Sequence, residues 1–279
     1  MSIIFREYKP APALSPYIQF FWTGTFNVNS GTNLLSQKTI PNGYVELIIH
    51  LNEFHCELLQ GTGYAPSPKY LMVGLFTKPY DVHFRKEVKV FGIRFKPEGI
   101  YHIFGMPASE MREDFADAES ITGKTFREYS SRLTEAKTVF EMISLSEKFI
   151  SGNISRNRIN LYYLNNAVEI IRKHKGMLSI NELAGKVYIG ARQLEREFKQ
   201  KIGISPKRYM RIVRLNEVNR MINSGRRINL SEVSFTAGYS DQAHFIRDFK
   251  YFTGETPNVL ISKKDEYIIN PGPDYPPSG

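Results

Sequence analysis

The chain has 279 residues, of which 42% are hydrophobic, a formal net charge of +9 and a single cysteine. This length is typical of two domains, and the hydrophobic content is sufficient for packed cores, which excludes general disorder. One cysteine excludes a disulfide framework and a cysteine-rich zinc site. No apolar run reaches the roughly 18 residues of a membrane span, and the start lacks a signal-peptide pattern. We therefore expect a cytoplasmic protein with no membrane partner.

Residues 1–150 are predicted to form a β-rich domain that ends in helices. Aromatic and β-branched residues dominate three runs that are separated by Gly, Pro or Asn, as expected of strands: residues 17–26, 43–51 and 82–95. Helical patterns follow over about residues 123–136 and 138–150. The fold class predicted for the whole chain is α+β.

The remaining residues are predicted to form a linker, an all-helical domain and a tail. Residues 151–158 are polar and show no periodicity, so we interpret them as a linker. Residues 159–262 have a helical pattern throughout. Residues 263–279 end in PGPDYPPSG, which has four prolines, and we expect this tail to be disordered.

The positive charge is concentrated in the helical domain. Residues 159–262 hold 17 Lys and Arg against 9 Asp and Glu, whereas the rest of the chain holds 20 against 19. Such an asymmetry is typical of a module that binds a polyanion, attached to a neutral module.

The helical domain contains an internal repeat. FKQKIGISP at residues 198–206 recurs as FKYFTGETP at residues 249–257, an offset of 51. At the same offset, Leu194 and Arg196 match Phe245 and Arg247. Further upstream the offset is 50, which one extra residue in a turn of the second copy explains. The domain is therefore predicted to be a duplicated structure.

Each copy has the pattern of a helix-turn-helix. In the first copy, Ser179 and Glu182 have the spacing of a capping box, which predicts a helix that begins near Ile180. A turn at residues 188–190 and a second helix over residues 191–201 follow. In the second copy, we expect the supporting helix at residues 231–237, a turn at Gly238 and Tyr239, and a second helix that begins at Ser240. One central helix, over residues 206–224, joins the copies.

The second helix of each copy is predicted to expose residues that suit double-stranded DNA. The Arg fork matches guanine in the major groove, Gln pairs with adenine, and Lys suits phosphate. The predicted outward residues are Arg192, Gln193, Glu195, Arg196 and Lys199 in the first copy, and Gln242, Ala243, His244, Arg247 and Lys250 in the second. The alternative is a helical protein–protein module in which these arginines are merely solvated.

Residues 237–257, AGYSDQAHFIRDFKYFTGETP, resemble the signature of the AraC/XylS family of bacterial transcription regulators. The resemblance covers residues 159–262 and implies two subdomains joined by a central helix, each with a recognition helix in the major groove. The implied base-facing residues are Arg192, Glu195 and Arg196, then Gln242, Ala243, His244 and Arg247. Glu195 and Ala243 depart from the usual chemistry, because an acid accepts only from cytosine N4 and alanine offers only apolar contact.

The N-terminal domain resembles, more weakly, a domain of unknown role that precedes this DNA-binding unit in a subgroup of the family. The resembling segments are IPNGYVELIIHL at residues 40–51 and VFGIRFKPEGIYHIFGMP at residues 90–107. The resemblance implies a barrel-like β-domain that binds a small-molecule effector, followed by helices that dimerise, here residues 125–150. RNA polymerase, such an effector and a second copy of the chain are therefore open as partners beside DNA.

Two other classes of function stay open on the sequence alone: an enzyme with a catalytic N-terminal domain tethered to DNA, and a non-specific architectural DNA binder. The sequence has no GxxxxGK, GxSxG or HExxH motif, so we expect no enzyme and no cofactor. His50, His55 and Cys56 lie together but lack an established metal-ligand spacing, and we expect no metal. Arg94, within an apolar run, is expected to pair with Glu46 or with an anionic ligand.

Overall fold

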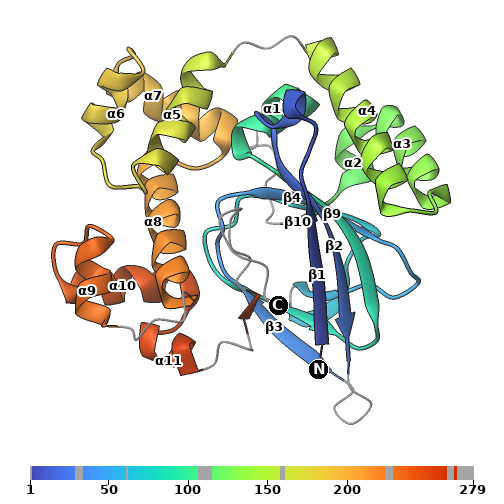
Figure 1. Cartoon of the computed structure of the whole chain (residues 1–279), viewed down its shortest axis with the longest axis horizontal. Helices are drawn as coiled ribbons and strands as arrows, with labels where there is room; N and C mark the ends of the chain where they lie inside the picture. The colour runs from blue at the N-terminus through green and yellow to red at the C-terminus, as the bar shows by residue number, and fades with distance from the viewer. Residues whose placement is uncertain are drawn as a thin grey trace. The chain divides into compact units, whose positions relative to one another are not determined.

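A computed structural model describes residues 2–28, 34–60, 62–105, 115–157, 161–223, 229–262 and 267–268. The chain divides into two compact units. The N-terminal unit comprises Met1–Ser36, Tyr44–Leu75 and Val82–Asn160. The C-terminal unit comprises Gln37–Gly43, Phe76–Asp81 and Leu161–Gly279. Figure 1 shows that the N-terminal part of the chain forms strands followed by helices and that the C-terminal part is mainly helical, as the sequence predicts.

The larger sheet has six strands in the order β1-β2-β9-β4-β7-β10, and each neighbouring pair is antiparallel. The strands are β1 (Ser2–Tyr8), β2 (Ile18–Asn27), β9 (Val88–Phe95), β4 (Val45–His50), β7 (Tyr70–Val73) and β10 (Phe115–Asp117). The register places Arg94 of β9 between Phe20 of β2 and Glu46 of β4. This register determines the partner of the buried arginine.

The smaller sheet has the order β11-β3-β8-β5-β6. Its strands are β3 (Leu35–Thr39), β5 (Glu57–Gln60), β6 (Gly63–Pro66), β8 (Tyr80–Phe84) and β11 (Tyr267–Ile268). The expected barrel-like closure is wrong for the described residues, because in neither sheet does the first strand pair with the last. The β-rich character itself is confirmed.

Residues 82–95, which the sequence predicts as one strand, form parts of two strands in different sheets. Arg85, Lys86 and Glu87 separate β8 from β9, and all three are exposed. Charged side chains cannot follow the buried strands into the core, so the chain leaves one sheet here and enters the other.

Helices cover one face of the larger sheet. They are α1 (Pro97–Phe104), α2 (Ala118–Thr122), α3 (Lys124–Glu135) and α4 (Val139–Asn157), preceded by the 3-10 helix η1 (Pro12–Leu14). Alternate residues of the sheet, among them Phe91, Ile93 and Leu47, pack with Phe126 and Ile150 of α3 and α4 in one core. Figure 1 shows α3 and α4 side by side.

Helix α4 continues beyond the point at which the sequence predicts a linker. It ends at Asn157, so residues 151–157 are helical, and Arg158 lies outside the described residues. These residues contain no proline, and a single glycine, Gly152, is too weak a breaker to end a helix. Among the described helices, none is both long and apolar enough to cross a membrane.

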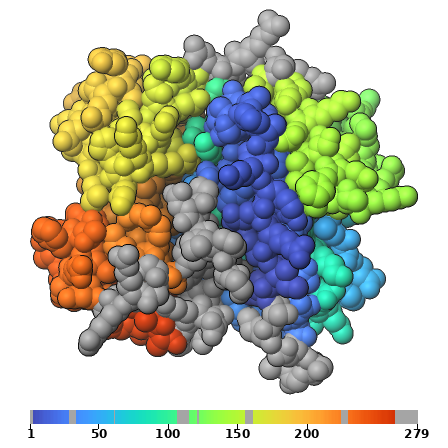
Figure 2. All heavy atoms as spheres, viewed as in Figure 1, coloured from blue at the N-terminus to red at the C-terminus, as the bar shows by residue number. Residues whose placement is uncertain are grey.

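The C-terminal unit is mainly helical, with α5 (Tyr162–Lys173), α6 (Ile180–Lys186), α7 (Ala191–Ile202), α8 (Pro206–Asn223), α9 (Leu230–Thr236), α10 (Gln242–Thr253) and α11 (Pro257–Ser262). The two predicted helix-turn-helix units, α6–α7 and α9–α10, are confirmed, with α8 between them (Figure 1). In Figure 2 the atoms of α5–α7 and those of α8–α10 form two adjoining lobes.

Helix α8 contacts α5 and α7 as well as α9 and α10. Its buried residues are Pro206, Tyr209, Met210, Ile212, Leu215, Val218, Asn219 and Ile222. At 3.6 residues per turn these positions are spread around most of the helix, which is typical of a helix enclosed by its neighbours. In the tail, the structure describes only Tyr267 and Ile268, which pair with Lys38 and Thr39 of β3. The other tail residues, 263–266 and 269–279, lie outside the described residues.

Candidate nucleic-acid interface

The first helix-turn-helix begins at the predicted capping box. Ser179 Oγ accepts a hydrogen bond from Glu182 N at 3.2 Å, and Glu182 Oε2 accepts one from Ser179 N at 2.7 Å. These bonds from Ser179 lower the pKa of Glu182. They satisfy two free N–H groups at the start of α6 and so fix where the helix begins.

Helix α7 has a buried face and an exposed face, as the repeat predicts. Leu194, Phe198 and Ile202 are fully buried. The predicted DNA-facing residues are all exposed: Arg192, Glu195, Arg196 and Lys199. The Arg196 side chain is 70% exposed, and its Nη2 lies 3.3 Å from Glu197 Oε1. Most of this side chain is therefore accessible to a ligand in solvent.

The second helix-turn-helix has the same plan with different caps. Asn229 Oδ1 accepts from Ser231 N at 3.0 Å at the start of α9. Asp241 Oδ1 accepts from His244 N at 2.7 Å and caps α10, which begins at Gln242 and not at Ser240 as predicted. The difference arises because the Asp241 side chain, not the Ser240 hydroxyl, satisfies the first N–H groups of the helix.

Helix α10 exposes four of the five residues assigned to DNA. They are Gln242, Ala243, Arg247 and Lys250. His244 is half-buried: its Nδ1 lies 3.2 Å from Ser240 Oγ, and its ring meets the Tyr239 ring edge-on at 5.3 Å. His244 is therefore less exposed than predicted, because the imidazole packs on the turn before its own helix.

An acid on each recognition helix anchors it to the rest of the unit, and neither acid is among the site residues predicted from the sequence. Glu197 of α7 and Asp248 of α10 are 51 residues apart, the offset of the repeat. This recurrence of an acid at one repeat position is the signal that identifies the pair.

Glu197 is held by groups on α5 and α7. Tyr163 Oη donates to Glu197 Oε2 at 2.9 Å, and Lys201 Nζ lies 2.6 Å from the same oxygen. The hydrogen bond from Lys201 is the largest cause that lowers the pKa of Glu197. The cluster joins the recognition helix of the first unit to α5.

Asp248 is buried more deeply, with 5% of its surface exposed. Arg211 Nε of α8 donates to Asp248 Oδ1 at 2.7 Å, and Tyr239 Oη donates to Oδ2 at 3.1 Å. Burial, followed by the charge of Asp248, raises the pKa of Tyr239. The second recognition helix is therefore tied to α8 by an ion pair whose carboxylate is buried.

The buried arginine of the N-terminal unit is paired within that unit. Arg94 is fully buried, and its Nε donates to Glu46 Oε1 at 2.9 Å, which confirms the expected pair. Phe20 lies under the guanidinium at 4.5 Å. Among the described residues, no cluster of three or more His, Cys, Asp or Glu side chains could hold a metal ion.

The structure brings His50, His55 and Cys56 together as a packed polar cluster. His50 Nε2 accepts from Cys56 N at 3.3 Å, and the His50 and His55 rings are stacked at 4.5 Å. Burial raises the pKa of the Cys56 thiol to about 11 and lowers that of His50 to about 4. A buried thiol with a raised pKa is not a nucleophile at neutral pH.

Two family models match the chain. Residues 6–117 match a family described as a domain of unknown function (DUF6597), and residues 183–262 match one described as a helix-turn-helix domain. Together the two matches cover most of the N-terminal and C-terminal compact units of the chain. The second match covers both recognition helices.

Two curated proteins are similar to part of the chain. The Msm operon regulatory protein of Streptococcus mutans is 25% identical over 119 residues, 42% of each chain. The HTH-type transcriptional regulator ArgR of Pseudomonas aeruginosa is 32% identical over 80 residues, 29% of this chain and 24% of ArgR. The chain thus spans less than half the length of the curated relatives it matches.

Among solved structures, ToxT from Vibrio cholerae has a TM-score of 0.49 at 10% identity, over 87% of this chain and 98% of ToxT. The duplicated fold and the matched residues together show that the chain carries an AraC-type helix-turn-helix domain, as found in transcription regulators, after a domain of unknown function.

Proposed function

We propose that this protein is a sequence-specific DNA-binding transcription regulator whose helices α7 and α10 read two successive segments of the major groove. The observation that carries the proposal is the duplicated recognition helix with an exposed arginine at one repeat position, Arg196 in α7 and Arg247 in α10. An exposed guanidinium on such a helix matches guanine O6 and N7.

The proposal assigns each exposed residue a role according to its chemistry. Arg192, Arg196 and Arg247 read guanine, and Gln242 reads adenine. Glu195 accepts from cytosine N4, and Ala243 contacts a thymine methyl. His244 contacts the DNA at the edge of the segment that α10 reads. Lys199 and Lys250 contact phosphates on either side.

The length of α8 supports reading on one face of the duplex. Its 18 residues span about 27 Å at about 1.5 Å per residue. Successive major-groove segments on one face are about 34 Å apart. The difference between these two lengths is smaller than the diameter of one helix, so a rod of this length suits two neighbouring segments.

Selection of bound duplexes with the purified full chain tests the proposal. We expect binding to the selected site to be at least about 1,000-fold tighter than binding to bulk DNA at physiological salt. Arg196→Ala and Arg247→Ala should each weaken binding by about 1–3 kcal/mol and relax base preference in one segment. The matched control is Arg6→Ala, an exposed arginine of β1 outside both the recognition helices and residues 125–150, which should leave binding unchanged.

Equal affinity for selected and bulk DNA would support an architectural binder and reject the proposal. Two residues that an enzyme could use do not support that alternative. Cys56 is buried with a raised pKa, and Arg94 is paired with Glu46. Because its ligand is chromosomal DNA, we place the protein in the bacterial cytoplasm.

We further propose that the N-terminal unit is regulatory: a small-molecule effector or a partner such as RNA polymerase shifts the population of DNA-competent states. We also propose a homodimer through residues 125–150, where the Phe140 side chain is 71% exposed. Light scattering of the full chain tests the dimer: Phe140→Asp should yield monomers, and a parent protein that is already monomeric would contradict it.

A further inference from the structure

The turn between α5 and α6, which leads into the first helix-turn-helix unit, contacts both α8 and the second helix-turn-helix unit. Lys175 and Gly176 in this turn have φ values of +53° and +74°. A Cβ added to Gly176 would lie 2.2 Å from Met210 O of α8, which no side chain tolerates. Glycine therefore lets the turn lie directly on the backbone of α8.

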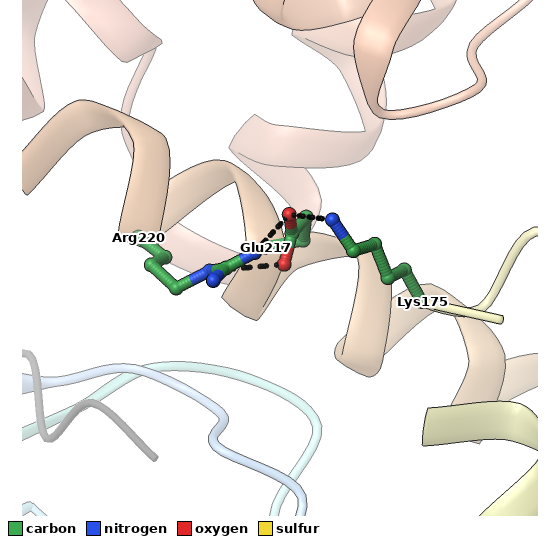
Figure 3. A network of polar contacts seen from close by, with 3 residues as sticks. All are labelled: Lys175, Glu217 and Arg220. Carbon is green, nitrogen blue, oxygen red and sulfur yellow. Dashed lines mark hydrogen bonds and ion pairs between the residues drawn. The ribbon is translucent and has the colours of Figure 1, made fainter. Parts of the chain in front are cut away.

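An ion-pair network holds this turn in place (Figure 3). Lys175 Nζ lies 2.7 Å from Glu217 Oε1, and Arg220 Nε donates to Glu217 Oε2 at 3.1 Å. Burial alone raises the pKa of Glu217, but the hydrogen bonds from Arg220 and Lys175 outweigh burial and keep the pKa below its usual value. The end of α5 is thus attached to the middle of α8.

Arg214 of α8 bridges the two units. Its Nη2 donates to Gly176 O at 3.0 Å, and its guanidinium lies 5.1 Å from the centre of the Tyr239 ring. Tyr239 in turn donates to Asp248 of α10. A continuous set of contacts therefore runs from the turn of the first unit to the recognition helix of the second.

A second contact joins the units beside Arg214. A Cβ added to Gly238 would lie 2.8 Å from Met177 Sδ. The Met177 side chain therefore fills the space that a side chain at position 238 would need. Gly238 also has a φ of +71°. The equivalent position of the first copy is Tyr188, which is 92% exposed, so the first copy makes no comparable contact there with the described residues.

We propose that this junction, made of Gly176, Met177, Arg214, Gly238 and Tyr239, fixes the rotation of α10 relative to α7 about α8 and so determines which half-site spacing the protein accepts. Helix α8 alone sets the distance, whereas the junction prevents the second unit from turning about α8. One inserted base pair moves a half-site by about 3.4 Å and rotates it by about 35°. The part that concerns DNA rests on the proposed function.

Whether the junction holds α7 and α10 in one fixed arrangement can be tested without DNA. Spin labels on Lys199→Cys and Lys250→Cys, in a full chain with Cys56→Ser, report the distance between α7 and α10 by pulsed EPR. We expect one narrow distance distribution in this parent protein and a broader one after Arg214→Met, which keeps the aliphatic length but removes the bridge. Met177→Ala, at a side chain 39% exposed and so safe for folding, should broaden it too.

Arg208→Met is the matched control, since Arg208 is an exposed arginine of the same helix and lies outside the junction. This variant should keep the narrow distribution. A parent distribution that is already broad, or equal widths in the parent, Arg214→Met and Met177→Ala, would overturn the proposal.

Duplexes with the selected site and with one base pair inserted between its halves test the consequence. Arg214→Met should reduce the parent's preference for the native spacing by about tenfold. Arg208→Met should weaken the affinity for both duplexes by the same factor. An unchanged preference in Arg214→Met rejects the role of the junction in spacing. If the parent does not distinguish selected from random DNA, the proposed function fails, while the label distances still decide the junction.

Discussion

The two helix-turn-helix units share one backbone plan but hold their recognition helices differently. In the first unit, Glu197 is partly buried, with 16% of its side chain exposed, and it pairs with Lys201 and Tyr163. In the second unit, the equivalent Asp248 is buried and pairs with Arg211 of α8. The duplication therefore preserved the apolar core and the exposed arginine, while the polar anchor of each helix diverged.

This difference indicates that the second recognition helix depends on a buried charge and the first mainly on apolar packing. A buried ion pair stabilises little in total, but the loss of one partner is costly because the other charge stays buried. Variants at equivalent repeat positions therefore test whether the two recognition helices are held differently.

The largest effect is expected where the two units are alike. Phe198 and Phe249 occupy equivalent positions and are both fully buried. Phe198→Ala and Phe249→Ala should each lower the free energy of unfolding by about 3–5 kcal/mol, because each leaves a cavity in the core. Urea denaturation of the full chain measures both, and costs that differ by several kcal/mol would show that the cores are not equivalent.

The next effect should separate the units. Asp248→Ala leaves Arg211 and the Tyr239 hydroxyl without their acceptor and should cost about 2–3 kcal/mol, at the low end for a buried pair because Arg211 is 33% exposed. Glu197→Ala should cost about 1 kcal/mol or less. The same urea titrations measure both, and equal costs would contradict the comparison.

A smaller effect concerns phosphate contacts and should be symmetric. Lys199 and Lys250 are equivalent and exposed. Lys199→Ala and Lys250→Ala should each reduce the slope of log affinity against log salt by about 0.9, since each removes one phosphate contact. Titrations of the selected duplex between low and physiological salt measure the slope, and an unchanged slope would reject a phosphate contact at that lysine.

The smallest effect is the pH dependence that Glu197 contributes to the first unit. Hydrogen bonds from Lys201 and Tyr163 hold the pKa of Glu197 below its usual 4.5. A depressed acid stabilises the fold above its unfolded pKa, and this contribution is lost as the pH falls below about 4.5 through the folded value. Glu197→Gln should therefore lose less stability than the parent between about pH 5 and pH 3. If chemical denaturation shows the same loss of stability for Glu197→Gln and the parent at these pH values, the hydrogen bonds of Glu197 do not stabilise the fold.

Much of the helical unit could be predicted because its signals are local. The capping box at Ser179 and the repeat at an offset of 51 indicate helix starts and the buried phenylalanines without knowledge of distant contacts. His244 is the exception on the recognition helices. Helical periodicity places it on the exposed face and does not show that its ring packs on Tyr239.

The anchors and the sheet arrangement depend on contacts between distant residues, so the sequence alone does not predict them. Asp248 meets Arg211 across two helices, and Glu46 meets Arg94 only because of the strand register. The division of residues 82–95 between two sheets and the open ends of those sheets follow from strand pairing, which alternation of apolar residues does not specify.

Footprinting of the full chain on its selected duplex tests the central claim most directly. We predict two protected segments about one helical turn apart on one face. Arg196→Ala should alter base preference in one segment only, and Arg247→Ala in the other only. A single protected segment, or the same altered position in both variants, would contradict the account.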